Sequence, residues 1–394
     1  MNSSTFSNYL ATHRSNLFKI IGIALLVKCA YFLFHFSILL STPQMILKGN
    51  EHKAFSLSLF KRNDSDWYER IYKNGYPKMN EADWKQVDSL HEQSTWAFFP
   101  LYPLSVKAIS KLTHTNFTTA GYIHALIFSL LCFTCFYLLA FEFFQDENKA
   151  FYCTLLFIIF PFHYYFSMLY SEAIFTFLVL LAFLSIQKGK YYVLLIPALL
   201  LPLARVNGII LLVPFAIAIL EQEQILAKTK LQLSKINLQT ILKLSLLLVM
   251  ILSFVAYAYY QHEMTGSYTA FSKAQSGWWR QLKMPYASFF ARGEMQAQFN
   301  SVYTILIMIV AIYSFKKLPI SYNIFIWISL LLPLLSGSTQ SMQRFIIVLF
   351  PFMFIFGNYI YTNFPKTKYA WLFVLFFLQL SCFYFWIISD PFSY

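Results

Sequence analysis

The sequence predicts an all-α integral membrane protein, built as a polytopic bundle of transmembrane helices. Of its 394 residues, 58% are hydrophobic and only 12% are charged, and the mean hydropathy is +0.54. An average soluble domain carries roughly 25% charged residues, so this chain has too little polar surface to cover a soluble core. The apolar residues also fall in long blocks, and a block of about 18 or more is typical of a membrane span.

Eleven apolar segments are candidate crossings, so we expect about 11 transmembrane helices in one membrane domain, 1–394. Several are short for a hydrocarbon core of about 30 Å. The pair at 191–204 and 207–220 could be two crossings, one broken pair or a re-entrant hairpin. The candidate segments are 17–40, 119–141, 149–166, 171–187, 191–204, 207–220, 244–262, 300–315, 321–335, 345–363 and 370–388.

The distribution of positive charge predicts the orientation. With the N-terminus in the cytoplasm, the short cytoplasmic pieces contain twelve Lys and Arg residues and the short outer pieces six, in agreement with the positive-inside rule. Two large outer segments result, a first extracytoplasmic loop at 41–117 and a second at 263–299. The twelve are Arg14, Lys149, Lys188, Lys190, Lys228, Lys230, Lys235, Lys243, Lys316, Lys317, Lys366 and Lys368; the six are Arg205, Lys273, Arg280, Lys283, Arg292 and Arg344.

Composition also argues against several classes of partner and cofactor. The net charge of +13 would suggest nucleic acid in a soluble protein, but here Lys and Arg beside anionic lipid account for it, so we expect a lipid bilayer and no nucleic acid. The five cysteines lie in apolar segments, where thiols behave as small hydrophobic groups. Cys132 and Cys135 have no second pair to complete a zinc site. We therefore expect no metal and no cofactor.

The first outer loop contains a polar and aromatic stretch at 63–77 with helical spacing. Asp66, Arg70 and Lys73 recur at helical intervals, and Gly75 is typical of a helix C-terminus. The pattern predicts a short amphipathic helix on the membrane with Asp64 at its N-terminal end, where the helix dipole favours a carboxylate. Local evidence alone favours a simple helix cap for Asp64. A second interfacial helix is expected at 102–112, after an aromatic segment split by two prolines.

Five stretches of the chain carry a more specific pattern. The first combines Asp64-Ser65-x-Trp67-Tyr68 and Gly75-Tyr76 with the segment Ala-Phe-Phe-Pro-Leu-Tyr-Pro at 97–103; the others are 166–172, 204–208, 266–278 and 337–345. In this order they resemble the GPI mannosyltransferase 2 (PIG-V-like) family and its prokaryotic relatives, from about 60 to 352. Asn63 departs from the pattern, because the family usually has Trp there.

The resemblance implies a GT-C-like fold and a glycosyltransferase activity. Such enzymes use a polyprenyl-phosphate sugar as donor and an essential Asp in the first outer loop. The expected reaction moves a hexose, for this family mannose, to a glycan or glycolipid acceptor by inverting displacement on the extracytoplasmic face. The chain is short and has no retention signal, so we expect a bacterial plasma membrane; a eukaryotic member would lie in the endoplasmic reticulum membrane.

The same resemblance, carried onto this chain, predicts the site residues. Asp64 is the expected base, with Asp66 as the alternative. Arg205 and Arg344 are expected on the leaving phosphate, with Lys273 and Arg280 as weaker candidates. Glu172 and Gln340 would bind sugar hydroxyls or brace the arginines. Further substrate-binding candidates are Asn207, Gln275, Trp67, Tyr68 and Trp278.

Simpler interpretations stay open. Arg205 could be a structural residue whose side chain reaches the membrane surface, and Trp278 could belong to an interfacial aromatic belt. The alternative function is a multi-pass lipid or sugar transporter or flippase without transferase chemistry. Transporters often show internal repeats and broken helices at the membrane midplane. We see no repeat, although 191–220 could be a broken helix.

Overall fold

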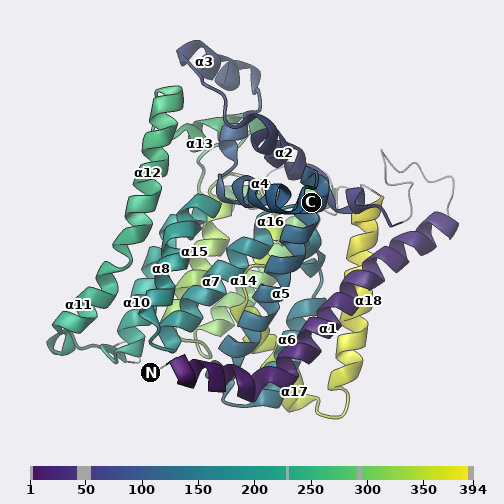
Figure 1. The fold of residues 1–394 in the computed structure, drawn as a ribbon, viewed down its shortest axis with the longest axis vertical. Helices are drawn as coiled ribbons and strands as arrows, with labels where there is room; N and C mark the ends of the chain where they lie inside the picture. Colours follow the sequence, from purple (N-terminus) through teal and green to yellow (C-terminus); the bar gives the residue numbers. More distant parts are fainter. Residues whose placement is uncertain (1–2, 42–54, 228–229, 291–294, 389–394) are drawn as a thin grey trace.

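Long and short helices standing side by side form the body of the molecule, and a few short helices lie across one end of it (Figure 1). The computed structural model describes residues 3–41, 55–227, 230–290 and 295–388. Positions 42–54 of the predicted first outer loop and 291–294 of the second lie outside the described residues, as do Lys228 and Arg292 of the charge count.

The elements of the body follow in chain order. They are α1 (Ser3–Ser41), α5 (Phe117–Phe144), α6 (Glu147–Ile159), α7 (Glu172–Gln187), α8 (Tyr191–Ala204), α9 (Asn207–Ile210), α10 (Leu212–Gln222), α11 (Leu238–Ser245), α12 (Leu248–Thr265), α14 (Met295–Ser314), α15 (Ile320–Leu334), α17 (Pro351–Asn363) and α18 (Lys368–Ile387).

Smaller elements connect them. These are α2 (Asp64–Asn74), α3 (Glu81–Leu90), α4 (Leu101–Thr113), α13 (Ala270–Lys273), α16 (Met342–Ile346), a two-residue antiparallel pair of β1 (Leu226–Ala227) and β2 (Lys230–Leu231), and the 3-10 turns η2 (Leu57–Phe60), η3 (Thr95–Ala97), η4 (His163–Ser167), η5 (Leu233–Lys235), η6 (Ala274–Trp278) and η7 (Pro285–Phe289).

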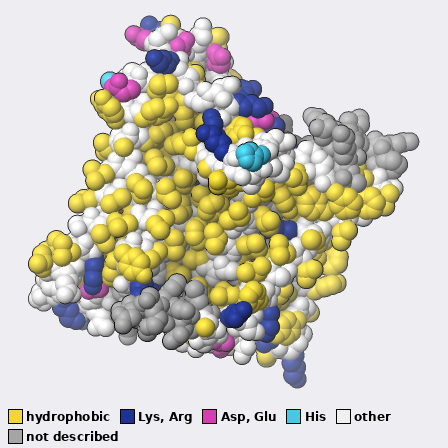
Figure 2. Space-filling view, in the orientation of Figure 1, with side chains coloured by type: hydrophobic (Ala, Val, Ile, Leu, Met, Phe, Trp, Pro, Cys, Tyr) yellow, Lys and Arg dark blue, Asp and Glu magenta, His cyan; other side chains and the backbone are white. Residues whose placement is uncertain are grey.

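Among the described residues, five helices are long and apolar enough to cross a membrane: α1 from Ala11, α5, α11 with α12, α14 and α18. Figure 2 shows hydrophobic side chains covering the flank of the bundle in a broad band, with charged side chains gathered toward its two ends. Such a band is what a bilayer requires of the surface it covers. These features agree with a multi-pass membrane protein, whereas the count of about 11 crossings stays a prediction.

Two predicted crossings were wrong as continuous helices. The segment 149–166 contains α6, which ends at Ile159, and then the 3-10 turn η4. Phe160 is extended because it precedes Pro161, and a residue before proline disfavours the helical region. The segment 345–363 is split between α16 and α17, and Pro351 begins the second helix. Each apolar run was long enough for one helix, but its proline divided it.

The ambiguous segment 191–220 forms an antiparallel hairpin of α8 with α9 and α10. At one end, the Tyr191 hydroxyl donates to Glu223 Oε1 at 3.1 Å, so the start of α8 lies beside the end of α10. At the other end, Arg205 at the turn pairs with Glu172 at the start of α7. Helices α7, α8 and α10 therefore run between the same two ends of the bundle. The 14 residues of α8 give a helix of about 21 Å.

Gly208 makes this sharp turn possible. A Cβ atom at Gly208 would collide with the backbone carbonyl of Leu201 in α8. The chain can therefore fold back this tightly only because position 208 has no side chain. The turn places Arg205 at the end of the bundle where Asp64 lies.

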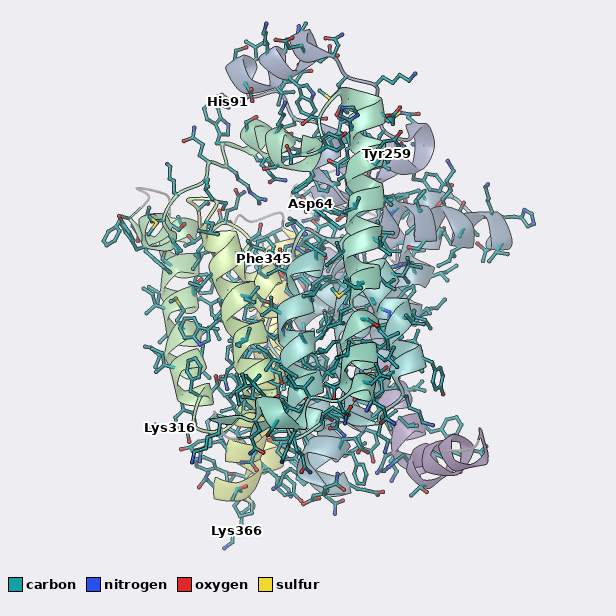
Figure 3. The ribbon with its side chains drawn as sticks, turned by 90° about the vertical axis from the view of Figure 1, so that its left-hand side faces the viewer. Asp64, His91, Tyr259, Lys316, Phe345 and Lys366 are labelled. Atoms are coloured by element: carbon teal, nitrogen blue, oxygen red, sulfur yellow. The ribbon has the colours of Figure 1, made fainter. Side chains whose placement is uncertain are left out.

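Charged residues in the described part of the chain lie at both ends of the bundle. Lys316 and Lys366 lie at the lower end in Figure 3, whereas Asp64 and His91 lie toward the upper end. At the lower end, Lys188 pairs with Glu142 and Lys243 with Glu223. The residues predicted for the cytoplasmic face thus lie opposite the residues predicted for the site. We call the two ends the Lys316 end and the Asp64 end.

Candidate functional site

Helix α2 carries Asp64 as its first residue, as the sequence pattern predicts. The helix ends at Asn74, where the N–H of Gly75 donates to the carbonyl of Ile71 at 2.9 Å and Gly75 adopts a φ of 72°. Asn63 occupies the cap position with a φ of 49° and makes no side-chain cap hydrogen bond. Asp64 is therefore not the cap residue, and its carboxylate is directed to another partner.

That partner is Arg344, which joins two carboxylates from distant parts of the chain. Its Nη1 donates to Asp64 Oδ2 at 2.7 Å. Its Nε and Nη2 both donate to Glu172 Oε1, at 3.0 and 2.8 Å. All three nitrogens of this buried guanidinium are therefore engaged. Within the described chain, Asp64 Oδ1 has no protein partner, and the Asp64 side chain is 28% exposed.

Glu172 is fully buried and also binds a second arginine. Arg205 Nη1 lies 3.2 Å from the same Oε1 atom. A buried carboxylate is stable only when it is paired, and here two guanidinium groups share it. In the described part of the protein, Nε and Nη2 of Arg205 make no hydrogen bond to protein, so this arginine keeps donors for a ligand.

Aromatic rings support the two arginines. Arg344 lies 4.3 Å above the ring of Tyr170 and 5.8 Å from that of Tyr165. Arg205 lies between the rings of Phe175 and Phe345, at 5.7 and 5.2 Å. Such cation–π contacts strengthen when the cation is removed from water. They hold both guanidinium groups in place at the edge of the bundle.

A cavity of about 670 Å³ opens beside this ion cluster. Its size is typical of small-molecule sites. Arg280 lines it together with Asp64, and Arg280 Nη1 donates to Gln275 Oε1 at 3.0 Å. Of the residues predicted from the sequence, the following line the cavity: Asp64, Trp67, Tyr68, Arg205, Asn207, Gln275, Trp278, Gln340 and Arg344.

Burial changes the titration of two groups in this cavity. It lowers the pKa of the Arg280 guanidinium, although the nearby Asp64 carboxylate opposes the shift, while Arg344 and Arg205 add to it. Burial raises the pKa of Tyr68 to about 12, helped by Glu172 and Asp64. The Tyr68 hydroxyl is therefore a neutral hydrogen-bond group at physiological pH, and it donates to Ser171 Oγ at 3.2 Å.

Three aromatic side chains form one wall of the cavity. The rings of Trp67 and Phe98 lie parallel within 9°, with centroids 6.0 Å apart. Trp278 meets both at steep angles, with centroids 5.4 and 5.5 Å away. We call Trp67, Phe98 and Trp278 the aromatic wall.

Two predicted residues lie away from both the cavity and the ion cluster, whereas Glu172 belongs to the ion cluster without lining the cavity. Asp66 is 61% exposed and pairs with Lys61 at 3.2 Å. Lys273 is exposed, and its Nζ lies 5.7 Å from the ring of Trp84. On α2, Asp66 lies two residues from Asp64 and so points to another side of the helix. Neither residue joins the ion cluster.

The sequence reasoning undervalued or missed several members of the site. Arg280 was only a weak candidate, yet it lines the cavity, whereas Lys273 does not. Tyr165 and Tyr170 were not singled out, although Tyr170 lies within the stretch 166–172 and Tyr165 directly precedes it. The role of these two tyrosines depends on where Arg344 packs. The one signal for it in the sequence was that aromatic residues lie close to Glu172 in the chain. Among the described residues, no group of three or more His, Cys, Asp or Glu side chains could hold a metal ion.

Comparison with known proteins shows a distant structural likeness. No protein-family model matches the chain, and no curated protein matches it. The chain is similar to the crystal structure of the Archaeoglobus fulgidus oligosaccharyltransferase in complex with zinc and sulfate, with a TM-score of 0.43 and 11% sequence identity. The match covers 95% of this chain and 53% of the archaeal chain, so the protein spans about half the length of that relative. The function must therefore be argued from the residues of this chain.

Proposed function

We propose that this protein is a membrane glycosyltransferase that transfers a hexose from a polyprenyl-phosphate donor to a hydroxyl of a glycan or glycolipid acceptor. Mannose is the sugar that the family resemblance indicates. The reaction takes place at the Asp64 end of the bundle, on the extracytoplasmic face of a bacterial plasma membrane; the positive-inside rule supports this orientation.

One observation carries the proposal: the same cavity is lined by a carboxylate oxygen and by donors of two arginines that have no partner among the described residues. Asp64 provides the carboxylate, and Arg205 and Arg280 provide the cations. Displacement of a lipid phosphate by a hydroxyl needs both, because a proton must leave the attacking oxygen while negative charge builds on the leaving group.

The proposed step is a single displacement at the anomeric carbon. The acceptor oxygen attacks that carbon from the face opposite the phosphate, and its proton passes to Oδ1 of Asp64. The bond between the anomeric carbon and the phosphate oxygen breaks, and its electron pair stays on the lipid phosphate. The configuration at the anomeric carbon is inverted, and atoms and charge balance without a cofactor.

The contacts divide the roles among the three arginines. Arg344 uses all three nitrogens on Asp64 and Glu172, so its role is to position the base. Arg205 and Arg280 take the phosphate, since guanidinium groups match phosphate oxygens in geometry and charge. Glu172 braces Arg205 and Arg344 rather than contacting the sugar.

The test is sugar transfer by the purified, detergent-solubilised protein. Polyprenyl-phosphate mannose is supplied with a panel of glycan and glycolipid acceptors, and the wild type is compared with Asp64→Asn and Asp66→Asn. Loss of a general base lowers the rate roughly 10²–10⁴-fold, which we expect for Asp64→Asn. Asp66→Asn is a matched control on the same helix, because its side chain faces Lys61, and it should retain full activity.

Two results would contradict this proposal. Absence of transfer from any polyprenyl-phosphate sugar would favour the transporter alternative. Full activity of Asp64→Asn, with loss in Asp66→Asn, would place the base at Asp66. Circular dichroism and thermal unfolding of each variant show whether the fold is retained.

A further inference from the structure

We propose that the aromatic wall is the acceptor subsite and that Trp278 is the platform on which a pyranose ring of the acceptor stacks. This inference rests on the proposed function and extends it, because it assigns the two substrates to two parts of the cavity. The chemistry is that of a carbohydrate face: the C–H groups of a pyranose ring are weakly positive, and an aromatic face is negative.

The base and the wall lie on the same side of α2. Asp64 and Trp67 are three residues apart in this helix, a spacing that puts their Cβ atoms about 5–6 Å apart on one face. Both line the cavity. A saccharide resting against the wall would therefore present its hydroxyls to the Asp64 carboxylate.

Trp278 is held on the wall by a close approach between two backbone segments. Gly277 packs against residues 92–93, and a Cβ atom there would lie 2.6 Å from the Glu92 carbonyl oxygen. Only glycine allows η6 to approach so closely. The neighbouring Trp279 takes a different direction: it stacks on His91 with centroids 3.6 Å apart and is 73% exposed.

Trp67 and Trp278 differ in how far their rings are already occupied. The Arg70 guanidinium lies 4.3 Å from the Trp67 ring centroid, and the Phe98 ring runs parallel to Trp67. Trp67 is therefore part of the structure of the wall. Trp278 is half-buried and touches both rings only at steep angles, so it keeps aromatic surface for a ligand.

An amide group completes the pattern expected of a carbohydrate site. Gln93 is exposed and lines the cavity, whereas the Gln275 amide is already engaged: its Oε1 accepts from Arg280, and its Nε2 donates to the carbonyls of Ala97 and Phe271 at 3.5 Å. Ligand sites combine apolar surface with a few polar groups that fix orientation. Stacking on Trp278 supplies the apolar surface, and the Gln93 amide supplies hydrogen bonds to sugar hydroxyls.

The donor also contains a hexose, and the position of the wall favours the acceptor. The donor phosphate is tied to a lipid chain in the membrane and so stays near Arg205, at the end of α8. In the aromatic wall, Trp67 belongs to α2, Phe98 directly follows η3, and Trp278 is the last residue of η6. In Figure 1, α2 and α13, which leads into η6, lie beyond the ends of α8 and α16. The sugar farther from the membrane is the acceptor.

The test compares Trp278→Ala, Trp278→Phe and the adjacent control Trp279→Ala. Initial rates are measured with the donor and acceptor varied in turn. Loss of one stacked ring should raise the acceptor KM about 10-fold, which corresponds to about 1.4 kcal/mol and lies within the range of aromatic stacking contacts. The donor KM should not change, Trp278→Phe should recover most of the affinity, and Trp279→Ala should match the wild type.

A second measurement does not depend on transfer. Isothermal titration of methyl hexosides and hexose disaccharides is done with each variant in the absence of donor. Saccharide binding by the wild type that is lost in Trp278→Ala supports the subsite even if no transfer is found, in which case only the proposed reaction fails. An unchanged acceptor KM in active Trp278→Ala overturns the inference. A raised donor KM alone also overturns it, because the ring would then hold the donor sugar.

Discussion

Arg344 lies 2.7 Å from Asp64 although the two residues are 280 positions apart in the sequence. This ion pair connects α16, at the end of the bundle, to the first turn of α2 in the predicted first outer loop. Glu172 at the start of α7 completes the arrangement, because it binds Arg344 and Arg205 through one oxygen. Three separate parts of the chain must therefore pack correctly before the candidate base is in place.

Removal of the buried charge on Glu172 should destabilise the protein. Glu172→Gln leaves the buried Arg344 with a single carboxylate partner, and breaking a buried pair costs about 3–5 kcal/mol. We expect a lower thermal midpoint in detergent. Glu81→Gln is the control, since Glu81 is 86% exposed and its pair with Lys85 is worth about 0.5 kcal/mol or less. Equal midpoints for the two variants would disprove the bracing role.

Weakening of the cavity arginines should raise the KM for the lipid-phosphate donor. Arg205→Lys keeps the charge but loses the two-pronged donor geometry, and Arg280→Gln loses the charge. Hydrogen bonds to charged groups are worth about 1.5–3 kcal/mol, so kcat/KM for the donor should fall at least 10-fold. Lys273→Gln is the matched control, because Lys273 faces Trp84 outside the cavity. A loss in Lys273→Gln as large as in Arg280→Gln would contradict our placement of the phosphate.

The tight turn after α8 should not tolerate a side chain at position 208. In Gly208→Ala the new methyl group meets the Leu201 carbonyl, so the α8–α10 hairpin must open and Arg205 must move. We expect a loss of both thermal stability and transfer. Gly22→Ala in α1 is the control: nothing lies within 4 Å of its Cβ position, and alanine is favoured over glycine in a helix by about 1 kcal/mol. Normal activity in Gly208→Ala would show that the turn differs from the one described.

The orientation predicted from charge can be tested by thiol labelling. In a background without the five native cysteines, Glu81→Cys at the Asp64 end should react with a membrane-impermeant maleimide in intact cells. Lys316→Cys at the opposite end should react only after permeabilisation, since the positive-inside rule puts it in the cytoplasm. The reverse labelling pattern would place the candidate site in the cytoplasm and exclude an extracytoplasmic reaction.

Local patterns in the sequence already determined much of this structure. The helix from Asp64 to Asn74 followed from side-chain spacing and from Gly75, and the apolar blocks located most of the long helices. The choice of Arg205 and Arg344 beside Asp64 came from the family resemblance, and the structure brings the three together. Each of these inferences uses residues that are near one another in the chain or a motif that can be read directly.

Only the tertiary structure decided which residues contact Asp64 and which charged residues line the cavity. Local spacing shows only that Asp64 and Asp66 point to different sides of a helix. The position of Arg344 decides which of them faces the cavity. In the same way, Lys273 and Arg280 are equivalent as charges in one loop, but only Arg280 lines the cavity. Periodicity, capping and hydropathy act over a few turns of helix. Contacts between residues hundreds of positions apart depend on how the whole bundle packs, and a single sequence does not display that packing.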